Sequence, residues 1–127
     1  MRLLRYGGLW TFLGYGFWAV CERDTGRFVG EVGLADFHRE IDWGQDAENA
    51  PECGWVLSPS AQGHGYATEA VVAALQWRDD HLPGSRTVCM IGPENTGSLR
   101  VAEKCGFRAL RDADYHGIVT LFERVTA

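Results

Sequence analysis

The chain has 127 residues, of which 46% are hydrophobic and 23% charged, and its formal net charge is −5. This length supports one core, so we expect a single domain over residues 1–127, and the composition excludes a disordered chain. The acidic balance argues against a nucleic-acid partner, which would favour a basic face, and is compatible with a cationic substrate such as an amine.

The first 21 residues resemble a signal peptide, because basic residues precede an apolar, aromatic-rich stretch. Four glycines interrupt that stretch, however, and no small-residue cleavage site closes it. It is also too short for a transmembrane helix, so no membrane partner is expected. We predict a hairpin instead, with strands at 17–21 and 28–34 joined by a turn at 23–26.

After a polar connection at 38–51, residues 52–57 read as a strand that ends at Ser58-Pro59. A helix is predicted over 67–81, because residues that recur at three- and four-residue spacing form one narrow apolar face. They are Ala67, Ala70, Val71, Ala74, Leu75 and Arg78. Pro83-Gly84 ends this helix.

The remaining elements are a strand at 86–91, a short helix at 98–104 and two closing strands at 107–110 and 118–124. Asn95 or Thr96 is the expected cap of the short helix, and Gly106 ends it. A loop is expected between the closing strands, over 112–117.

The turn between the strand at 52–57 and the first helix is the most informative segment. Gly63, Gly65 and Ala67 are small residues at alternate positions, so a ligand can approach the backbone closely. The helix that follows presents its first N–H groups and the positive end of its dipole there. These features predict a site for a phosphate or diphosphate. The alternative is an ordinary glycine-rich turn, since such short motifs are weak alone.

The four cysteines (Cys21, Cys53, Cys89 and Cys105) contain no Cys-x-x-Cys pair, and the histidines (His38, His64, His81 and His116) make no metal-ligand spacing. We therefore expect buried thiols and no metal site. Reduced thiols and the absence of an export signal favour the cytoplasm.

Three ordered motifs resemble the GCN5-related N-acetyltransferase (GNAT) superfamily, in particular its RimJ/RimL-like branch, which modifies the N-terminal amines of ribosomal proteins. They are Glu52…Gly54-Trp55, then Gln62-Gly63-x-Gly65-Tyr66-Ala67-Thr68-Glu69-Ala70, then Asn95-x-x-Ser98 with Glu103-Lys104-x-Gly106-Phe107. The resemblance spans Gly16 to Arg124. It implies an α+β fold with a mixed, mostly antiparallel sheet and flanking helices. It also implies that acetyl-coenzyme A (acetyl-CoA) binds as co-substrate where two parallel strands splay apart.

The resemblance implies that the diphosphate of the coenzyme meets the turn and that its pantetheine pairs with the preceding strand. The implied cofactor-binding residues are Trp55, Val56, Leu57, Gln62, Gly63, His64, Gly65, Tyr66, Ala67, Asn95 and Ser98. For His64 we expect the backbone N–H to bind and the side chain to point outward, without a catalytic role.

A protonated amine must lose a proton before it can attack, and Glu52 is the predicted base. The alternative is a solvated carboxylate at a strand end. Ala102 stands where many superfamily members have the tyrosine that protonates the leaving group, so Ser98 is the predicted substitute donor. Its alternative role is helix capping, and for Asn95 the alternative is turn formation.

Arg100 and Lys104 are expected either to face the coenzyme phosphates or to be solvated helix charges. The acceptor site is expected near Tyr115 and His116, with Asp36 and His38 as further candidates.

In the resembled family a strand and two helices precede the hairpin, and we expect nearly all of this region to be absent from the chain. Trp10, Phe12, Phe17 and Trp18 are then expected to be partly uncovered, which favours a homodimer or instability. Two functions remain: an N-acetyltransferase acting on a primary amine, and a non-catalytic acyl-CoA-binding or oligomerising module.

Overall fold

The structure is a computed structural model that describes residues 2–5, 16–35 and 50–126. Two compact units are distinguished within it. The first is built from Met1–Ala35 and Cys53–Leu82, and the second from Asp36–Glu52 and Pro83–Ala127. Each unit is described by itself below, and the single domain over 1–127 stays a prediction.

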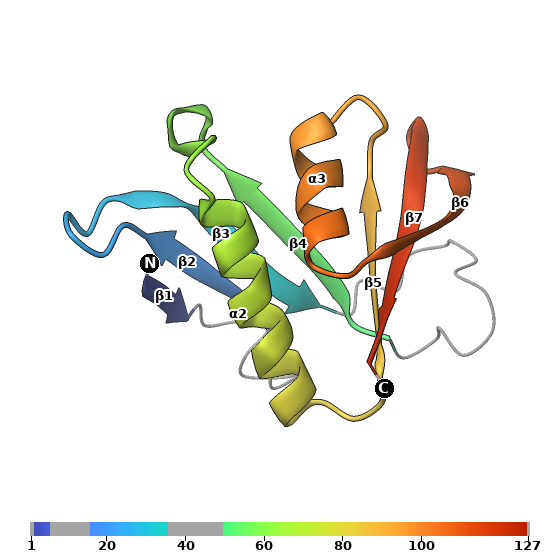
Figure 1. Cartoon of the computed structure of the whole chain (residues 1–127), viewed down its shortest axis with the longest axis horizontal. Helices are drawn as coiled ribbons and strands as arrows, with labels where there is room; N and C mark the ends of the chain where they lie inside the picture. The colour runs from blue at the N-terminus through green and yellow to red at the C-terminus, as the bar shows by residue number, and fades with distance from the viewer. Residues whose placement is uncertain (1, 6–15, 36–49, 127) are drawn as a thin grey trace. The chain divides into compact units, whose positions relative to one another are not determined.

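The first unit contains an antiparallel arrangement of strands followed by a long helix (Figure 1). Strand β1 (Arg2–Arg5) pairs with β2 (Phe17–Cys21), and β2 pairs with β3 (Phe28–Ala35). The hairpin of β2 and β3 was predicted, whereas β1 was not, because glycines follow it and its pattern is too short to read.

Strand β4 (Glu52–Leu57) follows β3 in the sheet order, and the backbone N–H of Ser58 just after it donates a 2.9 Å hydrogen bond to the carbonyl of Val29. The two strands approach so closely at Gly30 that an added Cβ would lie 2.2 Å from the carbonyl oxygen of Val56. Glycine is therefore required there, because any side chain would collide with backbone.

Helix α2 (Tyr66–His81) follows β4 after the short 3-10 turn η1 (Pro59–Ala61), and it contacts β3. Its buried residues are Ala70, Val71, Ala74, Leu75 and Arg78. The predicted narrow face is thus confirmed except at Ala67, which is half-buried.

Two aromatic side chains that were expected to be partly uncovered, Phe17 and Trp18, lie in this unit. Trp18 was expected to be partly uncovered, and this prediction is wrong: its side chain is 7% exposed and meets Trp77 of α2 edge-on, with ring centroids 5.5 Å apart. Phe17 is half-buried. Trp10 and Phe12 lie outside the described residues.

In the second unit, β7 (Ile118–Val125) lies between β5 (Arg86–Ile91) and β6 (Arg108–Asp114). It pairs antiparallel with both. Helix α3 (Thr96–Lys104) connects β5 to β6 in the chain. A parallel pair forms where Glu52, at the start of β4, lies opposite Val88 of β5. The fold is therefore α+β with a mixed, mostly antiparallel sheet, as predicted.

The closing hairpin differs from the prediction. Strand β6 continues to Asp114, so residues 112–114 belong to a strand and the loop is only Tyr115–Gly117. Cross-strand bonds explain the extension, since the Thr120 hydroxyl donates a 2.8 Å hydrogen bond to Asp112 Oδ1. Acidic residues have low strand propensity, which is why the sequence pattern suggested a loop.

All four cysteines are free thiols. Cys21, Cys53 and Cys89 are buried as expected, whereas Cys105 is only half-buried. Burial raises the pKa of the Cys105 thiol.

Candidate functional site

The predicted phosphate turn lies within the first unit, between η1 and α2. Gly63 has φ 87° and Gly65 has φ 75°, both in the left-handed region that favours glycine. A Cβ added to either residue would meet nothing within 4 Å. Gln62, Gly63, His64 and Gly65 are all exposed. Glycine is thus required by backbone conformation rather than by crowding, and the space above the turn is open.

Helix α2 begins directly at this turn. Gly65 is its N-cap residue, and no side chain makes a capping hydrogen bond there. The first intrahelical bond runs from the N–H of Glu69 to the carbonyl of Gly65 at 3.1 Å. Helix geometry leaves the N–H groups before that bond without an intrahelical acceptor, and the dipole of a 16-residue helix adds positive potential. The arrangement is suited to an anion.

The side chains of the turn are ordered around Tyr66, the first residue of α2. His64 is exposed and its ring stacks on that of Tyr66, with centroids 5.3 Å apart. The Tyr66 hydroxyl donates a 2.7 Å hydrogen bond to Oε2 of Glu22. This bond lowers the pKa of the Glu22 carboxyl and raises the pKa of Tyr66. No sequence pattern points to Glu22, which lies 44 residues from Tyr66 along the chain.

The strand that leads into the turn carries three further predicted residues. Trp55 and Leu57 are half-buried, and Val56 is 71% exposed. Gly54 lies against the ring of Phe17, because a Cβ added to Gly54 would be 3.3 Å from Cζ of that ring. These contacts anchor β4 within the first unit.

The predicted base, Glu52, is the last residue of the first segment of the second unit. It is 8% exposed, so the alternative of a solvated strand-end carboxylate is wrong. Glu52 lies opposite Val88, and the Val88 N–H donates a 3.0 Å hydrogen bond to the carbonyl of Pro51. A buried carboxylate needs a structural or chemical reason, because burial of charge is costly.

The two polar residues of the third motif lie together at the start of α3. Asn95 is the N-cap, and its Oδ1 accepts a 3.1 Å hydrogen bond from the backbone N–H of Ser98. Of the two predicted caps, Asn95 and Thr96, the structure has Asn95. The alternative that Ser98 caps the helix is wrong. The Ser98 side chain is half-buried in the first turn of α3.

The rest of α3 contains Ala102 and the two basic residues Arg100 and Lys104, for which roles were predicted. Ala102, which replaces the usual tyrosine, is fully buried, and its carbonyl accepts a 2.9 Å hydrogen bond from the Phe107 N–H. Position 102 thus faces the core of the second unit, where a small side chain packs. Arg100 and Lys104 are exposed, which agrees with solvated helix charges.

The acceptor-site candidates are only partly described. Tyr115 and His116 form the tip of the β6–β7 hairpin, where His116 adopts φ 54° and the Tyr115 N–H donates a 2.8 Å hydrogen bond to the Gly117 carbonyl. Their rings meet edge-on, with centroids 4.8 Å apart. Asp36 and His38 lie outside the described residues.

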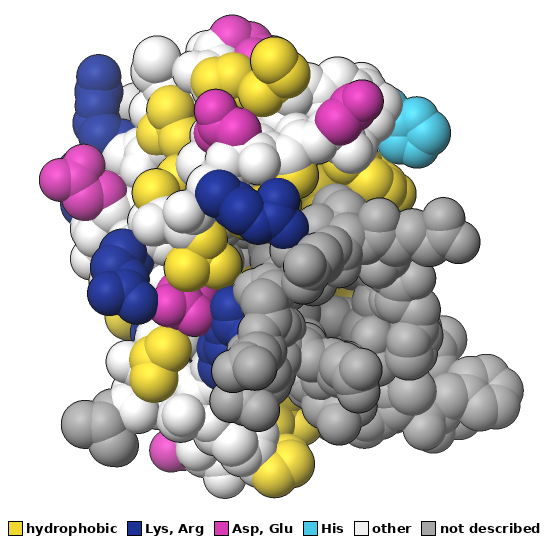
Figure 2. Space-filling view, turned by 90° about the vertical axis from the view of Figure 1, so that its right-hand side faces the viewer, with side chains coloured by type: hydrophobic (Ala, Val, Ile, Leu, Met, Phe, Trp, Pro, Cys, Tyr) yellow, Lys and Arg dark blue, Asp and Glu magenta, His cyan; other side chains and the backbone are white. Residues whose placement is uncertain are grey.

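The surface carries charges of both signs. On the face in Figure 2, basic and acidic side chains are interspersed. Among the residues at 2–5, 16–35 and 50–126, no three His, Cys, Asp or Glu side chains group in a way that would hold a metal ion. In the same part of the chain, neither helix is long and apolar enough to cross a bilayer.

Comparison with known proteins identifies the family. Residues 4–108 match the acetyltransferase (GNAT) domain, so the chain belongs to the GNAT acetyltransferase family. The uncharacterized protein YkkB of Bacillus subtilis (strain 168) is 33% identical over 97 residues, which are 73% of this chain and 52% of YkkB. The chain therefore spans about half the length of this curated relative.

Solved structures share the fold. A GnaT-family protein of Bordetella pertussis is 34% identical with a TM-score of 0.80, over 93% of this chain and 70% of that one. A phosphinothricin acetyltransferase of Sinorhizobium meliloti, solved in complex with acetyl-CoA, is 18% identical with a TM-score of 0.69, over 90% of this chain and 62% of that one. The second likeness is one of fold alone.

Proposed function

We propose that this chain transfers an acetyl group from acetyl-CoA to a primary amine and that the turn at 62–67 binds the diphosphate of the coenzyme. One observation carries the proposal: Gly63 and Gly65 hold left-handed backbone conformations, with open space above them, before a helix that no side chain caps. A bulky dianion fits such a surface, because backbone N–H groups meet it without a side chain between them. Membership of the GNAT family and the acetyl-CoA bound to the Sinorhizobium enzyme support this ligand.

Acetyl-CoA supplies a thioester, a reactive acyl donor. In the proposal, backbone groups of Trp55, Val56 and Leu57 pair with its pantetheine, and N–H groups of the same strand donate to the carbonyl oxygen as negative charge develops there. Asn95 contributes backbone, because its side-chain oxygen already caps α3.

Glu52 is the proposed base. Its carboxylate takes a proton from the ammonium form of the acceptor, so that the nitrogen lone pair can attack the thioester carbon directly. The new C–N bond forms, the C–S bond breaks and its electron pair leaves with sulfur, and the nitrogen gives up its second proton to solvent. The Ser98 hydroxyl then donates a hydrogen bond to the thiolate, which is a weaker aid than full proton transfer.

The N-terminal amine of a protein is the acceptor that we propose first, because the three motifs resemble the RimJ/RimL-like branch. The four free cysteines support a reducing compartment such as the cytoplasm. A homodimer stays a prediction, and the burial of Trp18 removes one of its supports.

The test combines binding and turnover. Acetyl-CoA binding is measured by calorimetry, and thiol release is then followed with N-terminal peptides, a polyamine, an aminoglycoside and free amino acids. Glu52→Gln is expected to lower kcat at least about 100-fold while coenzyme binding persists, because general-base catalysis is lost. Glu94→Gln, the same change at an exposed carboxylate, serves as the control.

The outcomes separate the alternatives. Binding with turnover that collapses in Glu52→Gln supports the enzyme and its base. Binding without turnover on any amine supports a non-catalytic acyl-CoA-binding module. If wild-type protein does not bind the coenzyme, the turn is not a diphosphate site and the proposal is wrong.

A further inference from the structure

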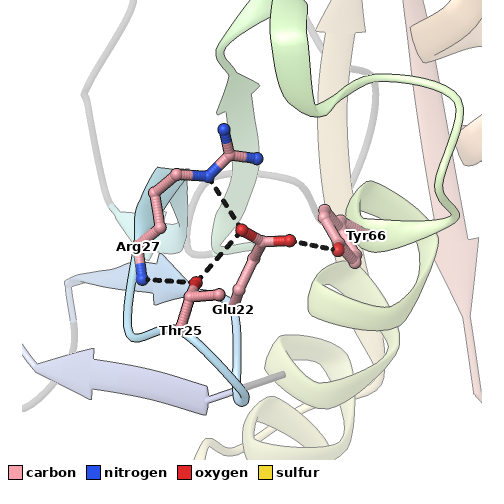
Figure 3. Close-up of polar contacts among 4 residues, drawn as sticks. All are labelled: Glu22, Thr25, Arg27 and Tyr66. Carbon is pink, nitrogen blue, oxygen red and sulfur yellow. Dashed lines mark hydrogen bonds and ion pairs between the residues drawn. The ribbon is translucent and has the colours of Figure 1, made fainter.

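Glu22, just after β2, is held firmly by its own hairpin. Its backbone N–H donates to the carbonyl of Arg27, and its carbonyl accepts from the N–H of Gly26, each at 2.8 Å. Its Oε1 accepts hydrogen bonds from Nε of Arg27 at 2.8 Å and from the Thr25 hydroxyl at 3.2 Å (Figure 3). The Arg27 N–H in turn donates to Thr25 Oγ1 at 3.1 Å. Backbone and side chain are thus both fixed.

The second carboxylate oxygen of Glu22 points to α2. Figure 3 shows the Tyr66 hydroxyl donating to Oε2, over a distance of 2.7 Å. A hydrogen bond to an ionised carboxylate is stronger than one between neutral groups. Arg27 balances the negative charge of this carboxylate. The bond therefore ties the β2–β3 hairpin to the first residue of the helix.

The turn just before Tyr66 has few restraints of its own. Its glycines are exposed, nothing packs where their side chains would be, and no side chain caps the helix. Glycine has more conformational freedom to lose than any other residue. A turn that is already fixed in its binding geometry loses less entropy when it meets a ligand. Whatever restrains Tyr66 therefore also affects affinity at the turn.

We infer that Glu22 is a positioning residue for the diphosphate-binding turn, acting through Tyr66 to hold the backbone at 63–67 in the geometry that receives the coenzyme. The inference rests on the proposed function. It assigns Glu22 a role in binding acetyl-CoA rather than in the chemical step.

Two conservative variants act on the bond from either side, one by deleting its donor and the other by removing the charge of its acceptor. Tyr66→Phe deletes only the hydroxyl, and Glu22→Gln keeps the shape of the side chain but not its charge. We expect each to raise the Kd for coenzyme A, measured by calorimetry, about tenfold. In Glu22→Gln the KM for acetyl-CoA should rise in parallel, with kcat unchanged. The double variant should bind no more weakly than Tyr66→Phe, because both substitutions act on the same bond.

Two controls test whether the effect concerns the turn. Asp24→Asn changes an exposed carboxylate of the same hairpin and should leave the Kd unchanged. S-acetylpantetheine lacks the diphosphate, so its kcat/KM should be equal in Glu22→Gln and in wild-type protein.

Hydrogen exchange of the amides at 63–67 gives a readout without ligand. We expect exchange to be faster in both variants than in wild-type protein. A Kd within twofold of wild type, or unchanged exchange at these amides, would overturn the inference. If wild-type protein fails to bind coenzyme A, the proposed function fails, whereas faster exchange in the variants would still establish the restraint of the turn.

Discussion

The side chain of Asn95 accepts a hydrogen bond from the backbone N–H of Ser98 and so caps α3. The two polar residues of one motif thus have separable roles. Asn95 uses its Oδ1 to complete the helix end, whereas only the backbone of Ser98 takes part in the cap. Stability and chemistry can therefore be tested independently at positions three residues apart.

Replacement of the cap should destabilise the protein. We expect Asn95→Ala to lower the free energy of unfolding by about 1 kcal/mol, because the Ser98 N–H loses its acceptor. Asn95→Asp keeps an acceptor oxygen and should stay close to wild type. Urea denaturation compares the three proteins, and equal midpoints for Asn95→Ala and wild type would contradict the capping role.

Loss of the Ser98 hydroxyl should affect turnover more than stability. We expect Ser98→Ala to change the free energy of unfolding by less than about 0.5 kcal/mol. Its kcat should fall about tenfold, because the leaving thiolate loses a hydrogen bond. Thr96→Ala, which removes another hydroxyl from the first turn of α3, is the control. Steady-state thiol release measures both variants, and a wild-type kcat in Ser98→Ala would exclude the donor role.

The contact between β3 and β4 at Gly30 should tolerate no side chain. We expect Gly30→Ala to destabilise the protein by at least about 2 kcal/mol, since its Cβ would collide with the Val56 carbonyl. Gly97→Ala is the matched substitution at a helical position where the added Cβ would make only an ordinary contact, 4.0 Å from Asn95 Oδ1, and it should stabilise by about 0.5 kcal/mol. Chemical denaturation of both variants tests the contrast, which a destabilised Gly97→Ala would contradict.

We expect Glu123 to make a pH-dependent contribution to the stability of the folded protein. Arg108 donates to its Oε1 at 2.6 Å and Arg86 to its Oε2 at 2.8 Å. The hydrogen bond from Arg108 has the largest effect, and together the two arginines lower the pKa of the Glu123 carboxyl below its usual 4.5. A carboxyl with a lowered pKa in the folded state stabilises the protein above its unfolded pKa, and that contribution is lost as pH falls through the folded pKa.

The matching experiment compares wild-type protein with Glu123→Gln in urea at pH 7 and at acidic pH. We expect the variant to be less stable by about 1 kcal/mol at pH 7, because Arg108 is exposed and its pairing is screened. The difference should shrink as the pH falls below about 4.5 and the wild-type carboxylate is protonated. A difference that is constant with pH would show that charge is not the cause.

The sequence predicted the elements with strong periodicity. The stripe from Ala70 to Arg78 placed α2 within one residue, because helical spacing alone identifies a buried face. Strand β6 was predicted too short, since its acidic residues Asp112 and Asp114 pair with Thr120 and Ile118 of β7, which no local pattern reveals. Strand β1 was missed because glycines follow it and its pattern is too short to read, so only its pairing with β2 defines it.

The candidate site was predictable where backbone conformation dictates residue type. Gly63 and Gly65 are needed for positive φ, so the turn could be read directly. Glu22 could not, because only folding brings it to Tyr66. The roles of Asn95 and Ser98 also needed the structure, since either residue type is common at a helix start.

The edge-on contact of Trp18 and Trp77 has a spectroscopic consequence. Both rings belong to the first unit, and their centroids are 5.5 Å apart. Indoles this close couple their electronic transitions, so the pair should produce an exciton couplet in the circular dichroism spectrum. That couplet should vanish in Trp18→Phe and would report melting of β2 against α2 without an attached label. Comparison with the amide signal of the whole chain would then show whether the two units unfold in one transition or in two.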